Sequence, residues 1–275
     1  MSAAPGRSQA SSHRSAQHEG TPVSGSGIKA MIMAAGRGER MRPLTDDTPK
    51  PLLQVRGKPL MQWPMEALAR EGFLQLVVNT AWLGERIADH FGSVFVPQAT
   101  PSNPDSLQNQ ELMTIAYSHE GRDFGAALET AGGIARALPL LGEVFWVMAG
   151  DIHAPDFRFT HAAVERFVHS GRLAHLWLVP NPEHNLQGDF GLSPDGLALR
   201  DAPRKYTYST IGLYRAALFA PPFCDIPAGN PQGIKSALAP LLRAAMDQGR
   251  VSAELYLGAW TDVGTPQRLA ELNRR

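Results

Sequence analysis

The 275-residue chain contains a single cysteine, Cys224, which excludes an intrachain disulfide. No second cysteine or histidine lies at ligand spacing from Cys224, so we interpret it as a packing residue. Such sparse cysteine usage fits a reducing compartment, and we expect the protein in the cytoplasm. An excess of positive charge is also missing, because 26 basic and 26 acidic side chains cancel. We therefore expect neither nucleic acid nor an anionic membrane surface as a partner.

Long apolar runs are missing as well, since none reaches the roughly 18 residues needed to cross a bilayer. Residues 1–27 are rich in serine, alanine, glycine and histidine and have no apolar core, which argues against a secretory signal. We predict a disordered N-terminal extension over 1–27, with a targeting segment as the alternative reading. We expect residues 28–275 to form one folded domain, with the polar, proline-bearing stretch 97–110 as a surface insertion.

The folded part alternates strand-like and helix-like segments. Apolar or β-branched runs predict strands at 28–35, 74–78, 112–118, 143–148, 173–179, 206–214 and 251–257. Helical spacing of apolar residues predicts helices at 60–71, 85–91, 130–141 (with Thr130 as N-cap), 156–170, 237–248 and from 266 onward. This order predicts an α/β fold with a mostly parallel sheet that is covered by helices on both faces.

The most distinctive pattern runs from residue 28 to residue 51. A short apolar strand ends in a loop that contains Gly36 and Gly38. Four basic residues follow in or near this loop: Arg37, Arg40, Arg42 and Lys50. Glycines at the end of a strand let an anion approach the backbone N–H groups closely. The pattern indicates an anion-binding loop; the alternative is a tight turn with solvated basic residues.

Two aspartates are predicted at the same edge of the sheet. Asp151 follows Gly150 at the end of the strand 143–148, and Asp262 comes soon after the strand 251–257. Ligands of open α/β sheets bind at the carboxyl ends of the strands. Either aspartate alone could cap a helix or close a turn. Beside an anion-binding loop, however, two carboxylates favour Mg²⁺, which binds one or two carboxylates together with substrate phosphates.

These motifs resemble a known family. The run Gly36-x-Gly-x-Arg40-x-Arg-Pro-Leu-Thr45 with Pro49-Lys50-Pro51 is similar to the signature of the sugar-1-phosphate nucleotidylyltransferases. Gly150-Asp151 and Trp260-x-Asp262-Val-Gly-Thr265 resemble the two metal-binding motifs of that family. Segments 79–84, 129–133 and 188–190 resemble its short bacterial N-acetylmuramate-1-phosphate uridylyltransferases. The resemblance implies a Rossmann-like (GT-A-like) mixed sheet in a single domain.

The resemblance also implies a reaction and roles for individual residues. The reaction would be Mg²⁺-dependent transfer of a uridylyl group from UTP to N-acetylmuramate α-1-phosphate, which yields UDP-N-acetylmuramate and pyrophosphate. Arg40 would hold the leaving pyrophosphate, and Lys50 would contact the α-phosphate or the sugar phosphate. Asp151 and Asp262 would hold Mg²⁺, so that Arg40, Lys50 and Asp151 form the catalytic set.

Other residues would bind the two substrates. The expected nucleotide contacts, besides Arg40 and Lys50, are Ala34, Gly36, Gly38, Glu39, Gly132 and Gly150, with a Gly132-Gly133 turn beside the base. Asn181 and Asp189 would contact the sugar, although both are also common turn residues. Many relatives have a Glu-Lys-Pro triplet where this chain has Asp201 and Pro203. Arg204 or Lys205 would then replace its lysine, or the contact is dispensable.

Several alternatives stay open at this point. Mannose-1-phosphate guanylyltransferase and glucose-1-phosphate thymidylyltransferase keep the reaction and change the substrates. A non-catalytic nucleotide sensor would keep the fold alone. A dinucleotide-binding dehydrogenase is disfavoured, because the loop reads Gly-x-Gly-x-Arg rather than Gly-x-Gly-x-x-Gly. We expect a monomer, because the chain has no second C-terminal module, and we assign Trp82, Trp146 and Trp177 to packing rather than to base stacking.

Overall fold

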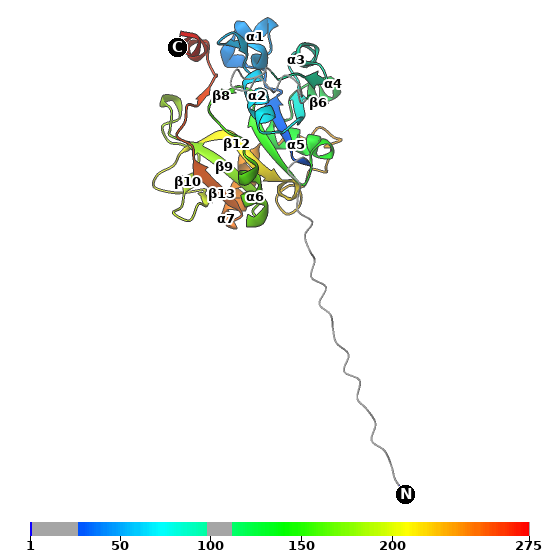
Figure 1. Ribbon diagram of the computed structural model, residues 1–275, viewed down its shortest axis with the longest axis vertical. Helices are drawn as coiled ribbons and strands as arrows, with labels where there is room; N and C mark the ends of the chain where they lie inside the picture. The colour runs from blue at the N-terminus through cyan, green and yellow to red at the C-terminus, as the bar shows by residue number, and fades with distance from the viewer. Residues whose placement is uncertain (2–26, 98–111, 275) are drawn as a thin grey trace, which may run out of the picture.

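A central sheet of eight strands organises the computed structural model, which describes residues 27–97 and 112–274 (Figure 1). Its strands lie in the order β13 (Val251–Leu255), β9 (Ala174–Val179), β12 (Thr207–Arg215), β7 (Val144–Ala149), β1 (Lys29–Ala34), β4 (Gln75–Thr80), β6 (Met113–His119) and β5 (Val94–Phe95). β12 runs antiparallel to both of its neighbours, and β5 runs antiparallel to β6. The other pairs are parallel, which confirms the expected mixed, mostly parallel sheet.

The middle of the sheet is buried on both faces. Met31 of β1 pairs in parallel register with Val77 of β4 on one side and with Val147 of β7 on the other. All three side chains are at most 2 % exposed. Strands that are buried on both faces have continuous apolar sequences, and for this reason their positions could be predicted from the sequence. Because the three strands are parallel, their carboxyl ends meet at one edge of the sheet, and this edge carries the site described below.

Helices cover each face of the sheet through a separate apolar cluster. α2 (Gln62–Arg70), α3 (Gly84–Phe91) and α6 (His161–Ser170) share one cluster with alternate residues of the central strands. α5 (Glu129–Ala137) and α7 (Leu238–Asp247) pack on the opposite face. Trp146 and Trp177 belong to the first cluster and Cys224 to the second, so their assignment to packing is confirmed.

The C-terminal helix α8 (Pro266–Arg274) packs on N-terminal segments that are distant in sequence. Leu269 and Leu272 join a third apolar cluster with Met41, Val55 and Leu60. In Figure 1 the red helix α8 accordingly lies at the same end of the molecule as the blue segment that contains α1 (Leu44–Asp47). The remaining short elements are the ribbons β2 (Gln54–Val55) with β3 (Lys58–Pro59), β8 (Ile152–His153) with β14 (Thr261–Asp262) and β10 (Gly191–Leu192) with β11 (Ala198–Leu199), and the helix α4 (Glu120–Phe124).

Several expected boundaries were wrong. The helix predicted from residue 156 begins at His161, because the Thr160 hydroxyl accepts a hydrogen bond from the Ala163 N–H and caps it there. Thr130 lies inside the first turn of α5 rather than at its N-cap, which is Leu128. β4 extends beyond the predicted end at residue 78 and includes Asn79 and Thr80. Asp262 lies in the β8–β14 ribbon, not directly after a strand of the central sheet.

Some expectations concern segments that the structure does not describe. The extension predicted over 1–27 and the insertion predicted over 97–110 fall almost entirely outside the described residues. Within the described residues, no helix combines the length and the apolar character that crossing a membrane requires.

Candidate active site

The glycine loop after β1 is held in shape by Thr45. Gly38 adopts a left-handed backbone with φ of 70°, and a Cβ placed there would lie 3.0 Å from Cγ2 of Thr45. The Thr45 hydroxyl donates a 2.8 Å hydrogen bond to the Gly38 carbonyl. Any side chain at position 38 would therefore meet both an unfavourable φ and a close contact. This explains why the loop needs glycine at this position.

The four basic residues of the loop have different roles. Arg37 donates to the Thr45 carbonyl, lies 3.6 Å over the Trp82 ring and pairs with Asp46. Arg42 also pairs with Asp46, at 2.7 Å. These two arginines stabilise the loop itself. Arg40 is exposed and makes no hydrogen bond or ion pair with the described residues. Arg40 and Lys50 both line a cavity, so they are the cations available to a ligand.

Lys50 and Asp151 form a short ion pair at the sheet edge. Lys50 Nζ lies 2.6 Å from Asp151 Oδ2, and the lysine side chain is only 10 % exposed whereas the aspartate is 36 % exposed. Lys50 begins a 3₁₀ turn, with Pro49 directly before it and Pro51 as its second residue, and Asp151 follows the carboxyl end of β7. A buried cation with a partly exposed anionic partner can exchange that partner for a phosphate at low desolvation cost.

Asp262 lies beside Asp151 through backbone pairing. The Val263 N–H donates a 2.8 Å hydrogen bond to the Asp151 carbonyl, and Asp262 pairs with Ile152 in the β8–β14 ribbon. The Asp262 carboxylate is also bound by Arg268 and lies 3.0 Å from Nε2 of His184. Sequence reasoning brought the two aspartates to the same edge but missed both of these partners.

The donor set at this edge suits a hard cation that also binds a substrate. Among the described residues, no group of three or more His, Cys, Asp and Glu side chains converges as a complete metal site. Asp151 and Asp262 supply only carboxylate oxygens. Mg²⁺ takes such ligands and completes its shell with water and substrate phosphates. Asp151 therefore fits Mg²⁺ held in part by a nucleotide, whereas Asp262 would have to exchange Arg268 and His184 for the ion. The assignment of both aspartates as ligands stays a prediction.

Three cavities follow one another along this edge. The first, here the loop cavity, has a volume of about 230 Å³ and is lined by Gly36, Gly38, Glu39, Arg40, Met41, Lys50, Asp151 and Gly264. The second, the central cavity, has about the same volume, 230 Å³, and is lined by residues that include Ala34, Gly36, Lys50, Gly150 and Asp151. Because both cavities share Gly36, Lys50 and Asp151, the ion pair marks their junction.

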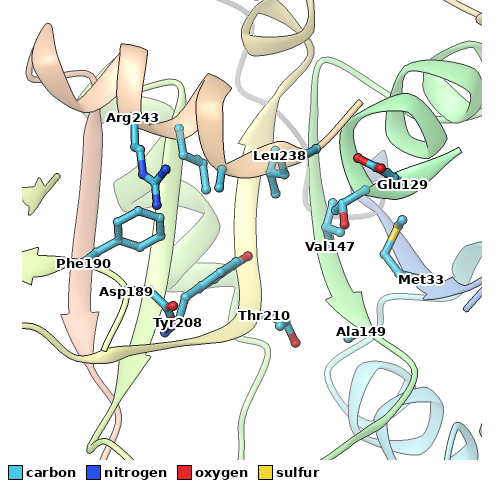
Figure 2. Close-up of a pocket in the computed structure, with 14 residues that line it drawn as sticks. Met33, Glu129, Val147, Ala149, Asp189, Phe190, Tyr208, Thr210, Leu238 and Arg243 are labelled. Carbon is cyan, nitrogen blue, oxygen red and sulfur yellow. Dashed lines mark hydrogen bonds between the residues drawn. The ribbon is translucent and has the colours of Figure 1, made fainter. Parts of the chain in front are cut away.

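The third, the large cavity, has a volume of about 560 Å³ and shares Met33, Glu129, Thr130 and Ala149 with the central cavity. Figure 2 shows Met33, Glu129 and Ala149 at one end of this cavity and Phe190 and Arg243 at the other. Its volume lies within the range of about 300–1,000 Å³ that is usual for small-molecule sites. The three cavities can thus hold a large ligand or two smaller ones in a row.

Thr210, which lines the large cavity, has a strained backbone conformation. The register of β12 against β9 shifts between Tyr208 and Gly212, and Thr210 within this bulge has φ of 67°. Its buried hydroxyl has no hydrogen-bond partner among the described residues, and Figure 2 shows the side chain near the middle of the cavity. A β-branched residue at positive φ with an unsatisfied hydroxyl is costly without a ligand. No pattern in the amino-acid sequence indicates a special role for this residue.

A buried network connects the glycine loop to α5. Asn79 accepts from the Ala34 N–H and donates to Glu120 Oε1, and Glu120 Oε2 accepts from the Leu128 N–H at 2.7 Å. Burial raises the pKa of Glu120, while its two hydrogen bonds oppose that rise. Both side chains line the central cavity. We did not predict Glu120 as a site residue, although it follows the predicted strand 112–118 at the same sheet edge.

Gly132 lies differently from the expectation. Gly132 and Gly133 are in α5, so the turn predicted at these glycines is wrong. A Cβ on Gly132 would lie 2.5 Å from the Ile234 carbonyl oxygen, which shows that its small size serves packing against the segment around residue 234. Glu129 and Thr130 of the same helix line the central cavity, whereas Gly132 does not. Gly150 is also tightly placed, because its N–H donates a hydrogen bond to the carbonyl of Met33 in β1.

Of the two predicted sugar contacts, Asp189 lines a cavity and Asn181 does not. Asp189 lines the large cavity, and its Oδ2 accepts from the Tyr208 N–H at 2.8 Å. The Asn181 amide bonds to the carbonyls of Leu186 and Lys205 and to the Thr207 hydroxyl, so it shapes the loop beside the cavity. Arg204 lies over the Tyr206 ring, and Lys205 pairs with Asp201 at 3.3 Å. Neither of these cations lines the three cavities, and a role in sugar binding stays a prediction.

Comparison with known proteins identifies the class. A nucleotidyl transferase family model matches residues 29–275, so the chain belongs to this family. The solved structure of a putative glucose-1-phosphate thymidylyltransferase from Bacillus anthracis has a TM-score of 0.67 and 18% identity, and covers 90% of this chain and 94% of its own. At that identity the likeness shows the fold alone, and it confirms the GT-A-like architecture.

Two curated relatives with the same described activity match most of this chain. An N-acetylmuramate alpha-1-phosphate uridylyltransferase from Neisseria meningitidis serogroup B is 45% identical over 252 residues, which is 89% of this chain and 96% of the relative. Another, from Caulobacter vibrioides, is 31% identical over 246 residues, which is 86% of this chain and 92% of the relative.

Proposed function

We propose that the protein transfers the uridylyl group of UTP to N-acetylmuramate α-1-phosphate and releases pyrophosphate. The observation that carries this proposal is the row of three connected cavities, in which Lys50 and Asp151 stand between the loop and central cavities and Ala149 stands between the central and large cavities. This arrangement fits two phosphorylated substrates that meet beside the ion pair. The 45% identity to a uridylyltransferase of this specificity over nearly its whole length supports the choice of substrates.

Each substrate is assigned to a cavity by its chemistry. The loop cavity, with Arg40 and the glycine backbone, suits the β- and γ-phosphates. The central cavity, between the sheet edge and Glu129, suits the nucleoside. The large cavity, with aromatic walls and polar groups such as Asp189 and Thr210, suits the sugar. The sugar phosphate then reaches the α-phosphate where the large cavity meets the central cavity at Ala149, next to Gly150 and Asp151.

The reaction itself needs positioning more than covalent chemistry. An oxygen of the sugar 1-phosphate attacks the α-phosphorus, the bond from that phosphorus to the bridging oxygen of the β-phosphate breaks, and pyrophosphate leaves with the electron pair. Lys50 neutralises charge on the phosphate that reacts, and Arg40 binds the leaving pyrophosphate. Holding both substrates in line converts a slow encounter of two polyanions into a step within one complex.

The proposed cofactor is Mg²⁺. Asp151 and Asp262 would hold it, and when bound it would neutralise phosphate charge and orient the phosphate oxygens.

We also propose that the protein is a monomer in the cytoplasm. Sedimentation analysis at micromolar protein tests the monomer, and a mass of two chains would contradict it.

A substrate panel tests the proposed function. Pyrophosphate release is measured for UTP, GTP and dTTP, each with the 1-phosphates of N-acetylmuramate, mannose and glucose, with and without Mg²⁺. We expect the highest kcat/KM for UTP with N-acetylmuramate 1-phosphate and none without a divalent cation. A higher value for GTP with mannose 1-phosphate, or for dTTP with glucose 1-phosphate, would replace the proposed substrates. Nucleotide binding without any turnover would favour a sensor.

A further inference from the structure

Of the described residues that line the large cavity, Arg243 alone carries a positively charged side chain. It projects from α7, is exposed, and has no hydrogen bond or ion pair to a described residue. Figure 2 shows its guanidinium beside the Phe190 ring, at the end of the cavity far from Ala149. A cation that lines a cavity without a protein partner is available to an anionic group of a ligand.

The opposite end of the cavity leads to the reaction centre. Ala149 immediately precedes Gly150 and Asp151, and it also lines the central cavity. A sugar phosphate that places its phosphate there directs the far side of its ring toward Arg243. Between the two ends lies the carboxylate of Asp189, which can accept hydrogen bonds from the hydroxyl and amide groups of the ring.

We propose that Arg243 selects sugar 1-phosphates that carry a carboxylate on the side of the ring remote from the phosphate. This inference rests on the proposed function, because the 3-O-lactyl ether of N-acetylmuramate supplies such a carboxylate, together with a methyl group. The nearby Phe190 offers an apolar surface for that methyl, and the arginine fork can bind both carboxylate oxygens. Glu129 and Asp189 would repel a carboxylate elsewhere in the cavity, which restricts the orientation of the ligand.

Binding of a matched pair of ligands tests the proposal. N-acetylmuramate 1-phosphate and N-acetylglucosamine 1-phosphate differ only by the lactyl ether. Their affinities are measured by calorimetry for the protein saturated with a non-hydrolysable UTP analogue. We expect the carboxylated sugar to bind the native protein about 10- to 100-fold more tightly, as a charge-assisted bidentate contact allows. Arg243→Ala removes this preference and leaves the affinity for the second ligand within about twofold.

Two further variants control the experiment. Arg243→Lys keeps the charge without the fork and retains part of the preference, and it also serves if the alanine variant fails to fold. Arg70→Ala removes an exposed arginine at the end of α2, outside the three cavities, and leaves both affinities unchanged. Equal weakening of both ligands by the Arg243 variants, or an unchanged preference, would overturn the proposal.

The outcome is separable from that of the substrate panel. If the panel favours another sugar phosphate while Arg243→Ala still removes the preference for the carboxylated ligand, the proposed function fails and the role of Arg243 stands. If N-acetylmuramate 1-phosphate is the best substrate and the variant keeps the full preference, the proposed function stands and the role of Arg243 fails.

Discussion

Lys50 Nζ lies 2.6 Å from Asp151 Oδ2, although the two residues are 101 positions apart in the chain. The contact joins the turn after the glycine loop to the carboxyl end of β7. Both residues line the loop cavity and the central cavity, so any ligand that spans the two passes this pair. Asp151 compensates the positive charge of the largely buried Lys50 side chain.

Lys50→Met tests the cationic half of the pair. We expect pyrophosphate release to fall by about 100- to 1,000-fold, because charge on the reacting phosphate loses its compensation. The KM for UTP should rise less, since the loop cavity keeps Arg40. The matched control is Lys58→Met, which breaks a second ion pair of 2.6 Å, to Glu66, outside the three cavities. A similar loss of turnover in both variants would indicate that the effect is structural.

Glu120→Gln tests the buried network under the central cavity. Glu120 accepts from both Asn79 and the Leu128 N–H, and an amide can accept only one of these donors. We expect the free energy of unfolding to fall by about 1–3 kcal/mol, because one buried donor loses its partner. The KM for UTP should rise, because Asn79 also accepts a hydrogen bond from the N–H of Ala34, which lines the central cavity.

Glu66→Gln is the control for this network, since Glu66 is also buried but binds Lys58 and Gln62 away from the cavities. Urea unfolding should show a loss for both variants, whereas the KM for UTP should change only for Glu120→Gln. An unchanged KM in Glu120→Gln would separate the network from nucleotide binding.

His153 predicts a dependence of stability on pH. Burial and, to a lesser extent, the charge of Arg56 lower its pKa to about 4, and Nε2 has no hydrogen-bond partner among the described residues. The folded state therefore binds fewer protons than the unfolded state, whose histidines titrate near a pKa of about 6.5. The contribution of neutral His153 to the free energy of unfolding is complete above about pH 6.5. It is lost as the pH falls toward 4, by about 3 kcal/mol in total.

His153→Phe should flatten this part of the pH profile, because phenylalanine keeps the aromatic contact with Trp63 and does not titrate. Urea unfolding at intervals between pH 7 and pH 4 checks it, with the same substitution of the exposed His90 as the control. A variant whose stability falls as steeply as that of the native protein would show that other groups control the acid limb.

The central sheet was predictable because its strands are apolar on both faces. β1 and β7 were located within one residue at each end, since a run such as residues 143–148 has no other plausible place than the core. The helix boundaries were less predictable. Thr160 caps α6 by one side-chain hydrogen bond, and nothing in the sequence distinguished this residue from Asp156 as the starting point.

Part of the site was predictable, because the carboxyl ends of neighbouring parallel strands meet at one edge of the sheet. Asp151 and the glycine loop follow parallel strands that are neighbours in the sheet, so their proximity follows from the strand order. The roles of the arginines did not follow, because only the folded loop shows that Asp46 binds Arg37 and Arg42 and leaves Arg40 to the cavity. Thr210 and Arg243 were missed because a bulge and the rotation of a helix decide which side chains reach a cavity.

Asp151→Asn gives the most direct test of the claim that the Lys50–Asp151 pair is the centre of nucleotidyl transfer. The substitution keeps the shape of the side chain and removes the charge that would hold Mg²⁺. Turnover of UTP with N-acetylmuramate 1-phosphate and the dissociation constant of UTP are measured on the same preparation. We predict that turnover falls by about 100-fold or more while UTP binds within about threefold of the native affinity. Turnover within a few-fold of the native value would contradict the account.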